Sequence, residues 1–201
     1  MEAIANALKP YNEVLGVAFG VIGLLAAIIF YVLAKREKKP RYGTLANAVI
    51  EDAQAALKGL QVTFNGAVQN RVNVLYFFFW NDGREAIRRS DNAPSNRLRI
   101  SFARGADVLS ASVLETTSRA CDFSINHYTV RVDDEPRHVI DLDFEFLNFR
   151  DGCALQLVHN GKIEHSVEFI GTVIGAQPLE HISIDWTGYP KGPWFLVETI
   201  G

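Results

Sequence analysis

The residues of this 201-residue chain that could do chemistry are five histidines, two cysteines and a row of carboxylates. No histidine stands at metal-ligand spacing from a cysteine, and the cysteines form no CxxC pair. The chain contains no GxxxxGKS/T, GxGxxG, GxSxG or HExxH motif. A nucleophile–base pair of Cys121 and His127 stays an alternative, although a small buried cysteine is far commoner. We therefore predict no catalytic residue, no metal site and no cofactor. The remaining residues of these two types are His138, His159, His165, His181 and Cys153.

The carboxylate row consists of Asp141, Asp143 and Glu145, which alternate with apolar residues. On a strand they would share one face, with about 7 Å between neighbours. Three interpretations are open: a Ca²⁺ site, a solvated strand face, or cross-strand pairs with Arg97 and Arg99, which alternate in the same way. Oxygen cages usually come from loops, so a solvated face is favoured.

An arginine-rich segment stands out in an otherwise acidic region. Residues 1–41 hold six of the 20 Lys and Arg and three of the 23 Asp and Glu, so residues 42–201 carry a net charge of −6. A region of that sign is not drawn to nucleic acid, and none is predicted as a partner. Arginine forks suit carboxylates and phosphates. The segment therefore predicts either a solvated loop or a surface for an anionic partner. Its candidate binding residues are Arg84, Arg88, Arg89, Arg97 and Arg99, and Arg104 follows them.

An apolar run near the N-terminus predicts a transmembrane helix over residues 14–34. Val14 to Leu33 contains no charge and no proline, and its twenty helical residues would span about 30 Å, the thickness of a bilayer core. A cleaved signal peptide would carry a basic segment before the run, whereas here the basic cluster follows it. We expect an uncleaved signal anchor in the cell inner membrane, with residues 1–13 outside and the C-terminal domain cytoplasmic. The cluster consists of Lys35, Arg36, Lys38, Lys39 and Arg41.

Small residues within this run follow a 4-3-4 spacing. Gly16, Gly20, Gly23 and Ala27 would lie on one face of a helix and permit close helix packing in lipid. The stripe predicts a homodimer or contact with another membrane protein. Glycine and alanine are also common in membrane helices, so the spacing alone does not decide between association and composition.

The rest of the chain alternates with a period of two and predicts strands. Residues 35–59 are expected to form a basic juxtamembrane segment and linker, helical over 51–58, with 42–50 open between helix and strand. Residues 60–201 are expected to form an antiparallel β-sandwich, so the fold class is mainly β. Val72 to Trp80 predicts a strand buried on both faces, and Asn81, Asp82 and Gly83 a turn with positive φ. Asn65-Gly66, Asp151-Gly152 and Asn160-Gly161 predict further turns.

Three segments carry a resemblance to a known group of proteins: FFFWNDGREAIRRSDNAPSNRLRI, VIDLDFEFLNFRDGCALQLVHNGK and FIGTVIG. They resemble a group of uncharacterised bacterial single-pass membrane proteins with an N-terminal anchor and a cytoplasmic immunoglobulin-like domain. The match covers residues 60–175; Asn92, Asn96 and Arg97 depart from it. The resemblance implies an immunoglobulin-like sandwich and assigns no activity. The matching positions are Trp80, Asn81, Gly83, Ile87, Asp91, Leu98, Ile100, Phe144, Leu147, Asp151, Gly152, His159, Gly161, Gly171 and Gly175.

These features together predict a membrane-anchored interaction or sensing module, or a subunit of a membrane complex. A sandwich binds through its loops and edges, although a fold alone does not give a function. The alternative is a membrane-anchored hydrolase whose site the sequence does not reveal.

Overall fold

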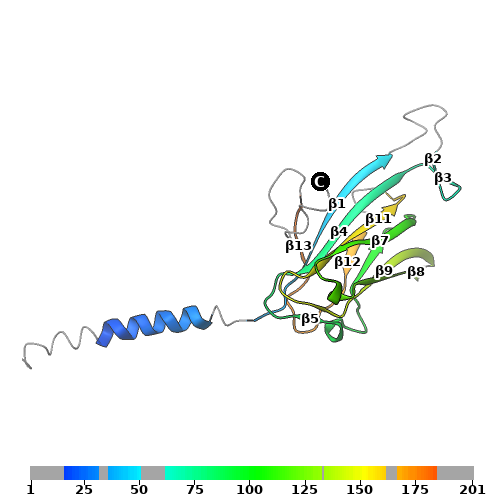
Figure 1. Cartoon of the computed structure of the whole chain (residues 1–201). Coiled ribbons are helices and arrows are strands. Elements are labelled where there is room, and N and C mark those ends of the chain that lie inside the picture. The colour runs from blue at the N-terminus through cyan, green and yellow to red at the C-terminus, as the bar shows by residue number, and fades with distance from the viewer. Residues whose placement is uncertain (1–15, 32–35, 51–61, 133, 162–166, 185–201) are drawn as a thin grey trace, which may run out of the picture. The chain divides into compact units, whose positions relative to one another are not determined.

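The computed structural model describes residues 16–31, 36–50, 62–132, 134–161 and 167–184 (Figure 1). The chain divides into two compact units, residues 1–36 and residues 37–201. The described part of the first unit is helical over residues 16–31. The second unit is built from strands, so the protein is mainly β with one helix, as the sequence predicts.

The helix is apolar along its described length. Among the residues that the structure describes, no helix is both long enough and apolar enough to cross a membrane. Residues 14–15 and 32–34, which the sequence places at the ends of the predicted transmembrane segment, lie outside the described ranges.

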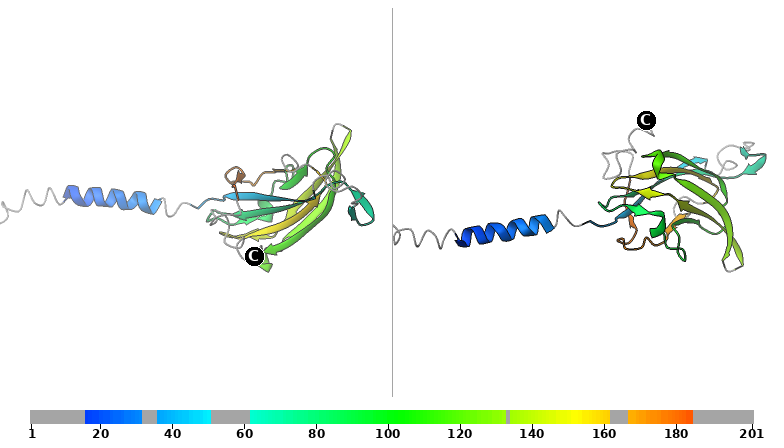
Figure 2. Two further views of the ribbon diagram at one scale, coloured as in Figure 1. Left: turned by 90° about the horizontal axis from the view of Figure 1, so that it is seen from above. Right: turned by 60° about the horizontal axis from the view of Figure 1, so that its bottom comes forward.

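Two larger sheets form the second unit. One has the strand order β13-β1-β4-β11-β7, and the other has the order β12-β6-β9-β8. Two short pairs, β10-β5 and β2-β3, complete the sheets of the described chain. The β8–β9 hairpin reaches out at the end of the unit opposite to the start of β1 (Figure 2). The strands are β1 (Pro40–Ile50), β2 (Val62–Phe64), β3 (Ala67–Gln69), β4 (Val72–Asn81), β5 (Ile87–Arg88), β6 (Arg99–Phe102), β7 (Val108–Thr116), β8 (Ser124–Val132), β9 (Glu135–Asp143), β10 (Phe146–Leu147), β11 (Gly152–His159), β12 (Val167–Ile170) and β13 (Glu180–His181), with 3₁₀ turns η1 (Arg89–Asp91) and η2 (Arg119–Cys121).

The central strand β4 is buried on both faces, which confirms the sequence prediction. Phe77 and Phe79 point into the main core, which the second sheet supplies with Ile100 of β6 and Ile140 of β9. The alternate residues of β4 form a second cluster on the opposite face of the same sheet, where Trp80 is 2% exposed. β4 therefore packs against the main core on one face of its sheet and against the smaller second cluster on the other face. The second cluster consists of Leu45, Phe78, Trp80 and Ala154, with Tyr76, Ile182 and Ile184 packed against it.

The structure corrects where the sheets begin, the direction of one strand pair and the φ angles at residues 81–83. Residues 42–50, left open between helix and strand, belong to β1, which pairs antiparallel with β4; the sheets therefore begin at residue 40 and not at 60. The helix expected over 51–58 lies outside the described residues. β13 runs parallel to β1, whereas all pairing was expected to be antiparallel. Asn81, Asp82 and Gly83 are not among the residues of positive φ. Asn65 and Gly66 do have positive φ, of 49° and 82°, as the predicted turn requires.

Candidate functional site

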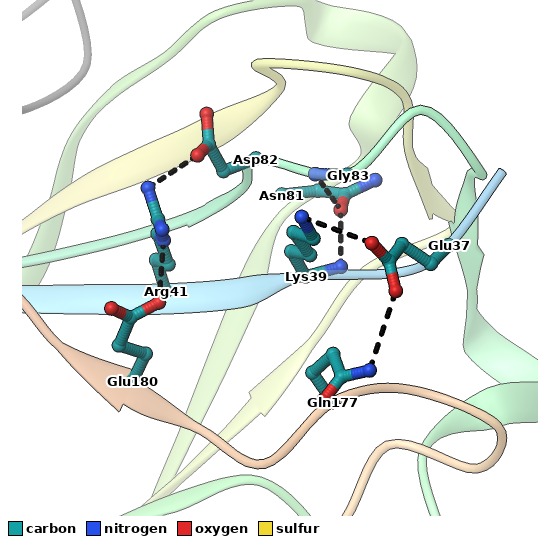
Figure 3. A network of polar contacts seen from close by, with 8 residues as sticks. All are labelled: Glu37, Lys39, Arg41, Asn81, Asp82, Gly83, Gln177 and Glu180. Atoms are coloured by element: carbon teal, nitrogen blue, oxygen red, sulfur yellow. Dashed lines mark hydrogen bonds and ion pairs between the residues drawn. The ribbon is translucent and has the colours of Figure 1, made fainter. Parts of the chain in front are cut away.

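A polar network surrounds Asn81 at the end of β4 (Figure 3). Asn81 is fully buried, and all four hydrogen-bonding positions of its side-chain amide are used. Its Oδ1 accepts from the backbone N–H groups of Lys39 at 3.2 Å and Gly83 at 3.0 Å. Its Nδ2 donates to the carbonyls of Glu85 at 2.7 Å and Leu147 at 3.0 Å. One side chain therefore joins three separate segments of the chain.

The backbone just before β1 lies directly on the loop that follows β4. The N–H of Asp82 donates to the carbonyl of Lys39 at 2.9 Å, and that of Glu85 to the carbonyl of Glu37 at 3.3 Å. A Cβ added at Gly83 would lie 2.0 Å from the Glu37 carbonyl oxygen and 2.5 Å from the Lys39 nitrogen. The glycine is therefore required by close approach of two backbones, because no side chain fits between them.

The other side of this segment is held by the loop before β13. The N–H of Gln177 donates to the carbonyl of Lys38 at 3.1 Å, and its Nε2 donates to Glu37 Oε2 at 3.3 Å. Lys38 Nζ also donates to the carbonyl of Ile174 at 3.4 Å. We call this arrangement the entry clamp: residues 37–41, held between residues 81–85 and residues 174–180.

Three of the five basic residues in the predicted juxtamembrane cluster are engaged by carboxylates within the second unit. Lys38 Nζ lies 2.9 Å from Asp91 and 3.7 Å from Glu85, and its side chain is only 12% exposed. Lys39 Nζ lies 3.0 Å from Glu37. Arg41 pairs with Asp82 and, at 2.8 Å, with Glu180. The basic residues that predict membrane topology thus also bind the start of β1 to carboxylates of the second unit.

The arginine-rich segment is spread over the β4–β6 region, and part of it is paired with the carboxylate row. Arg89 lies 3.1 Å from Asp143 and 3.4 Å from Glu145, and Arg99 stands opposite Asp141 in the β6–β9 register. Arg89 belongs to η1 and not to a facing strand, so these ion pairs are not the cross-strand pairs with Arg97 and Arg99 that the sequence allows. The side chains of Asp143 and Glu145 are 48% and 57% exposed, as on a solvated face. Arg84, Arg88 and Arg97 are exposed, and Arg104 pairs with Glu135 at 2.9 Å.

The small-residue stripe lies on the surface of the helix. A Cβ added at Gly16, Gly20 or Gly23 would meet no atom within 4 Å, and Ala27 is exposed. Its role in helix association stays a prediction.

A histidine pair that the sequence analysis missed lies on the β8–β9 hairpin. His127 Nε2 and His138 Nδ1 are 3.0 Å apart, and His138 Nε2 lies 3.4 Å from Asp107 Oδ1. His127 faces Ile140 in the register and His138 faces Thr129, so the histidines are diagonal neighbours on one face. Burial, and then the neighbouring His138, lower the pKa of His127. Only the hairpin register reveals the pair, because the two residues are 11 positions apart.

His159 is a structural residue of the core. It is 1% exposed, its Nδ1 accepts from the N–H of Gly161 at 3.2 Å, and its ring meets Phe102 edge-on. Burial lowers the pKa of His159, so the neutral form is favoured. His159 therefore stabilises the chain at Asn160-Gly161 through this hydrogen bond.

Both cysteines are free and buried. Burial is the main cause that raises the pKa of Cys121, and it raises that of Cys153 strongly. Cys121 is hydrogen-bonded to Thr117 and Ser118, whereas the ring partner of His127 is His138. The structure does not bring Cys121 and His127 together as a nucleophile and its base.

Among the residues that the structure describes, no group of three or more His, Cys, Asp or Glu could hold a metal ion. No protein-family model matches the chain, and neither a curated protein nor a solved structure is significantly similar to it.

Proposed function

We propose that this protein is a membrane-tethered interaction or sensing module. In this proposal the apolar helix anchors the chain in the cell inner membrane, and the two-sheet domain meets its partner in the cytoplasm. The entry clamp is the observation that carries the proposal. It fixes residues 37–41, directly after the predicted anchor, to both β4 and the segment before β13. The clamp thus gives the second unit an ordered start at residue 37.

The exposure of the apolar side chains of the helix supports the proposal that it is a membrane anchor. Ten of its large apolar side chains are more than half exposed, among them Phe19, Leu24 and Phe30. A helix that is apolar all round needs an apolar environment, because water does not tolerate so large an uncovered surface. Lipid is the environment that its sequence fits. The full set is Val17, Phe19, Val21, Ile22, Leu24, Leu25, Ile28, Ile29, Phe30 and Tyr31.

The strand order supports an immunoglobulin-like sandwich as the finer description of the fold. The order β1-β4-β11-β7 corresponds to the A-B-E-D sheet of that fold, and β6 beside β12 corresponds to its C–F pair. The β8–β9 hairpin would then be an addition beside strand C. Such sandwiches present binding loops on a rigid scaffold, which suits an interaction module.

The cytoplasmic side is favoured by the basic cluster and by the thiols. Positive residues that follow an anchor stay on the cytoplasmic side. Cys121 and Cys153 are unpaired in the structure, as is usual in a reducing compartment.

Copurification tests whether the protein binds a partner protein. We would tag the C-terminus, extract the full-length chain from its host membranes in mild detergent, and identify what elutes with it. A stoichiometric second protein is expected. Combined Arg84→Glu, Arg88→Glu and Arg89→Glu substitutions should reduce its capture, while Arg131→Glu, on exposed β8, should not. A chain that elutes alone from these membranes would contradict the interaction role.

The small-residue stripe can be tested in the same preparation. Gly20→Ile should disrupt assembly if the stripe packs against another helix, because the larger side chain separates the backbones. The domain should remain folded, since Gly20 belongs to a separate compact unit, residues 1–36. Unchanged assembly would refute this role for the stripe.

A further inference from the structure

We propose that His127 and His138 form a binding site for an imidazole-preferring divalent metal ion such as Zn²⁺. The site lies on the β8–β9 hairpin and is independent of the anchor and of the entry clamp. It has two protein ligands, and water would complete the coordination.

The spacing of the two nitrogens suits a shared ion. His127 Nε2 and His138 Nδ1 lie 3.0 Å apart. Two nitrogens bound to one tetrahedral Zn²⁺ at about 2.0–2.1 Å are separated by about 3.3 Å. Small ring rotations would therefore open the pair enough to admit the ion. In the metal-free pair one nitrogen must carry a proton to bond the other. When the ion binds, that proton would move to the other nitrogen of the same ring, so that both histidines stay neutral ligands.

A carboxylate stands where it would orient one of the ligands. Asp107 Oδ1 lies 3.4 Å from His138 Nε2, on the side of the ring away from His127. With its proton on Nε2, beside this carboxylate, His138 keeps the lone pair on Nδ1, which faces His127 Nε2. Metal-binding histidines commonly have such a carboxylate partner, which fixes the tautomer and makes the ligand more basic.

Asp107 is itself held in place. Asn160 Nδ2 donates to Asp107 Oδ2 at 3.0 Å, and the N–H of Asp107 donates to Asn160 Oδ1 at 2.7 Å. The orienting carboxylate therefore comes from the segment before β7 and is fixed by the end of β11. Because Asp107 is already held in place, little conformational entropy is lost there when the ion binds.

The histidine pair is also accessible from solvent and stands on two paired strands. His127 is exposed, and the side chain of His138 is 22% exposed, so an ion can reach the nitrogens from solvent. β8 and β9 pair continuously from Ser124–Asp143 to Val132–Glu135, so the ligands stand on paired strands.

Zn²⁺ titration of the full-length protein in detergent tests the proposal. The chain carries a tag without histidines and is first stripped with a chelator; binding is followed by calorimetry. We expect one Zn²⁺ per chain. His127→Ala and His138→Ala should each weaken binding by at least about tenfold, and Asp107→Asn by about tenfold. His181→Ala is the matched control, since this exposed histidine belongs to β13, and it should leave the affinity unchanged.

A second measurement separates loss of the site from loss of the fold. Zn²⁺ should raise the midpoint of thermal unfolding of the wild-type protein, because an ion that binds only the folded state stabilises it. It should leave the midpoint of His127→Ala unchanged, while the metal-free variant unfolds near the wild-type temperature. Equal Zn²⁺ affinity in the wild-type protein and in both histidine variants would overturn the proposal. So would the absence of Zn²⁺ binding to the wild-type protein.

Discussion

The side chain of Asn81 accepts a hydrogen bond at 3.2 Å from the backbone N–H of Lys39, 42 residues earlier in the chain. Asn81 ends the most buried strand of the protein, and Lys39 directly precedes the first. This contact explains why a buried asparagine occupies a strand end. Its amide offers two acceptor and two donor positions, and the crossing of three backbone segments uses all of them.

Replacing Asn81 by aspartate should destabilise the domain in a pH-dependent way. The new carboxylate would still accept from Lys39 and Gly83, but its second oxygen would face the carbonyls of Glu85 and Leu147. Leaving buried groups unpaired costs about 1–3 kcal/mol, and a buried charge costs more. Burial would raise the pKa of the introduced carboxyl. The variant should therefore lose further stability as the pH rises and that carboxyl ionises.

Urea unfolding at several pH values measures this effect. Asn81→Ala serves as the comparison, because it removes all four side-chain hydrogen bonds without adding a titratable group. A constant difference in unfolding free energy between Asp and Ala at this position, from pH 4 to 8, would contradict the account.

Gly83→Ala should open the entry clamp. The added Cβ would lie 2.0 Å from the Glu37 carbonyl oxygen, so residues 37–39 would have to move. We expect a loss of about 1–3 kcal/mol in unfolding free energy, the usual cost of overpacking. Trypsin should also cleave faster after Lys38, whereas Pro40 protects the bond after Lys39. Gly20→Ala, where the added Cβ would meet no atom of another segment within 4 Å, is the control that should change neither quantity in the domain. Unchanged cleavage in Gly83→Ala would mean that the clamp does not hold this segment.

His159 should make the domain less stable in mild acid. Burial lowers its pKa below the ordinary value of 6.5, so the unfolded chain binds the proton more readily than the folded one. Its contribution is fully present above about pH 6.5 and is lost as the pH falls through the lowered pKa. The difference in unfolding free energy between the wild-type protein and His159→Gln should accordingly shrink as the pH falls from 7 to 5. A difference that does not vary with pH would show that His159 is not held neutral.

The cysteines should be unreactive in the folded protein. Burial raises the pKa of both thiols, so little thiolate exists near pH 8 and reagents cannot reach it. A disulfide reagent should modify neither Cys121 nor Cys153 in native protein and both of them in urea. Ser95→Cys, at an exposed position, should react at once under native conditions. Rapid modification of the native wild-type chain would contradict the burial.

Much of the β architecture could be predicted from local sequence. The run from Val72 to Trp80 has the apolar density of a strand buried on both faces, and Asn65-Gly66 has the composition that its turn requires. β1 could not be assigned, because it overlaps the Ala-rich run ANAVIEDAQAALK, which suits a helix by propensity, while residues 42–50 suit a strand equally well. Its strand conformation comes from pairing with β4, a tertiary interaction that overrides propensity.

The polar sites were harder to predict because their members are distant in sequence. The entry clamp joins residues about 40 and 140 positions apart, so no local pattern marks it. The sequence marks Gly83 as a turn residue that can take positive φ, whereas in the structure its lack of a side chain permits close contact of two backbones. The histidine pair could have been found from the alternation of the two strands, had the position of the hairpin tip been known.

Several positions that carry the resemblance to bacterial membrane proteins have structural roles here. Ile87, Leu98 and Leu147 are fully buried, and a Cβ added at Gly152 would lie 2.3 Å from the carbonyl oxygen of Phe79. Such positions specify packing, which is why the resemblance implies a fold and no chemistry. The resemblance itself stays a prediction.

Membrane fractionation with charged variants of the helix tests the central claim most directly. Two arginines at Ile22 and Leu25 would cost about 5–7 kcal/mol on an insertion scale, while Val68→Arg places the same charge on an exposed position of β3. The account predicts that wild-type protein and Val68→Arg remain with the membranes after alkaline extraction, and that the double variant Ile22→Arg, Leu25→Arg is released. Release of the wild-type chain, or retention of the double variant equal to wild type, would contradict the membrane tether.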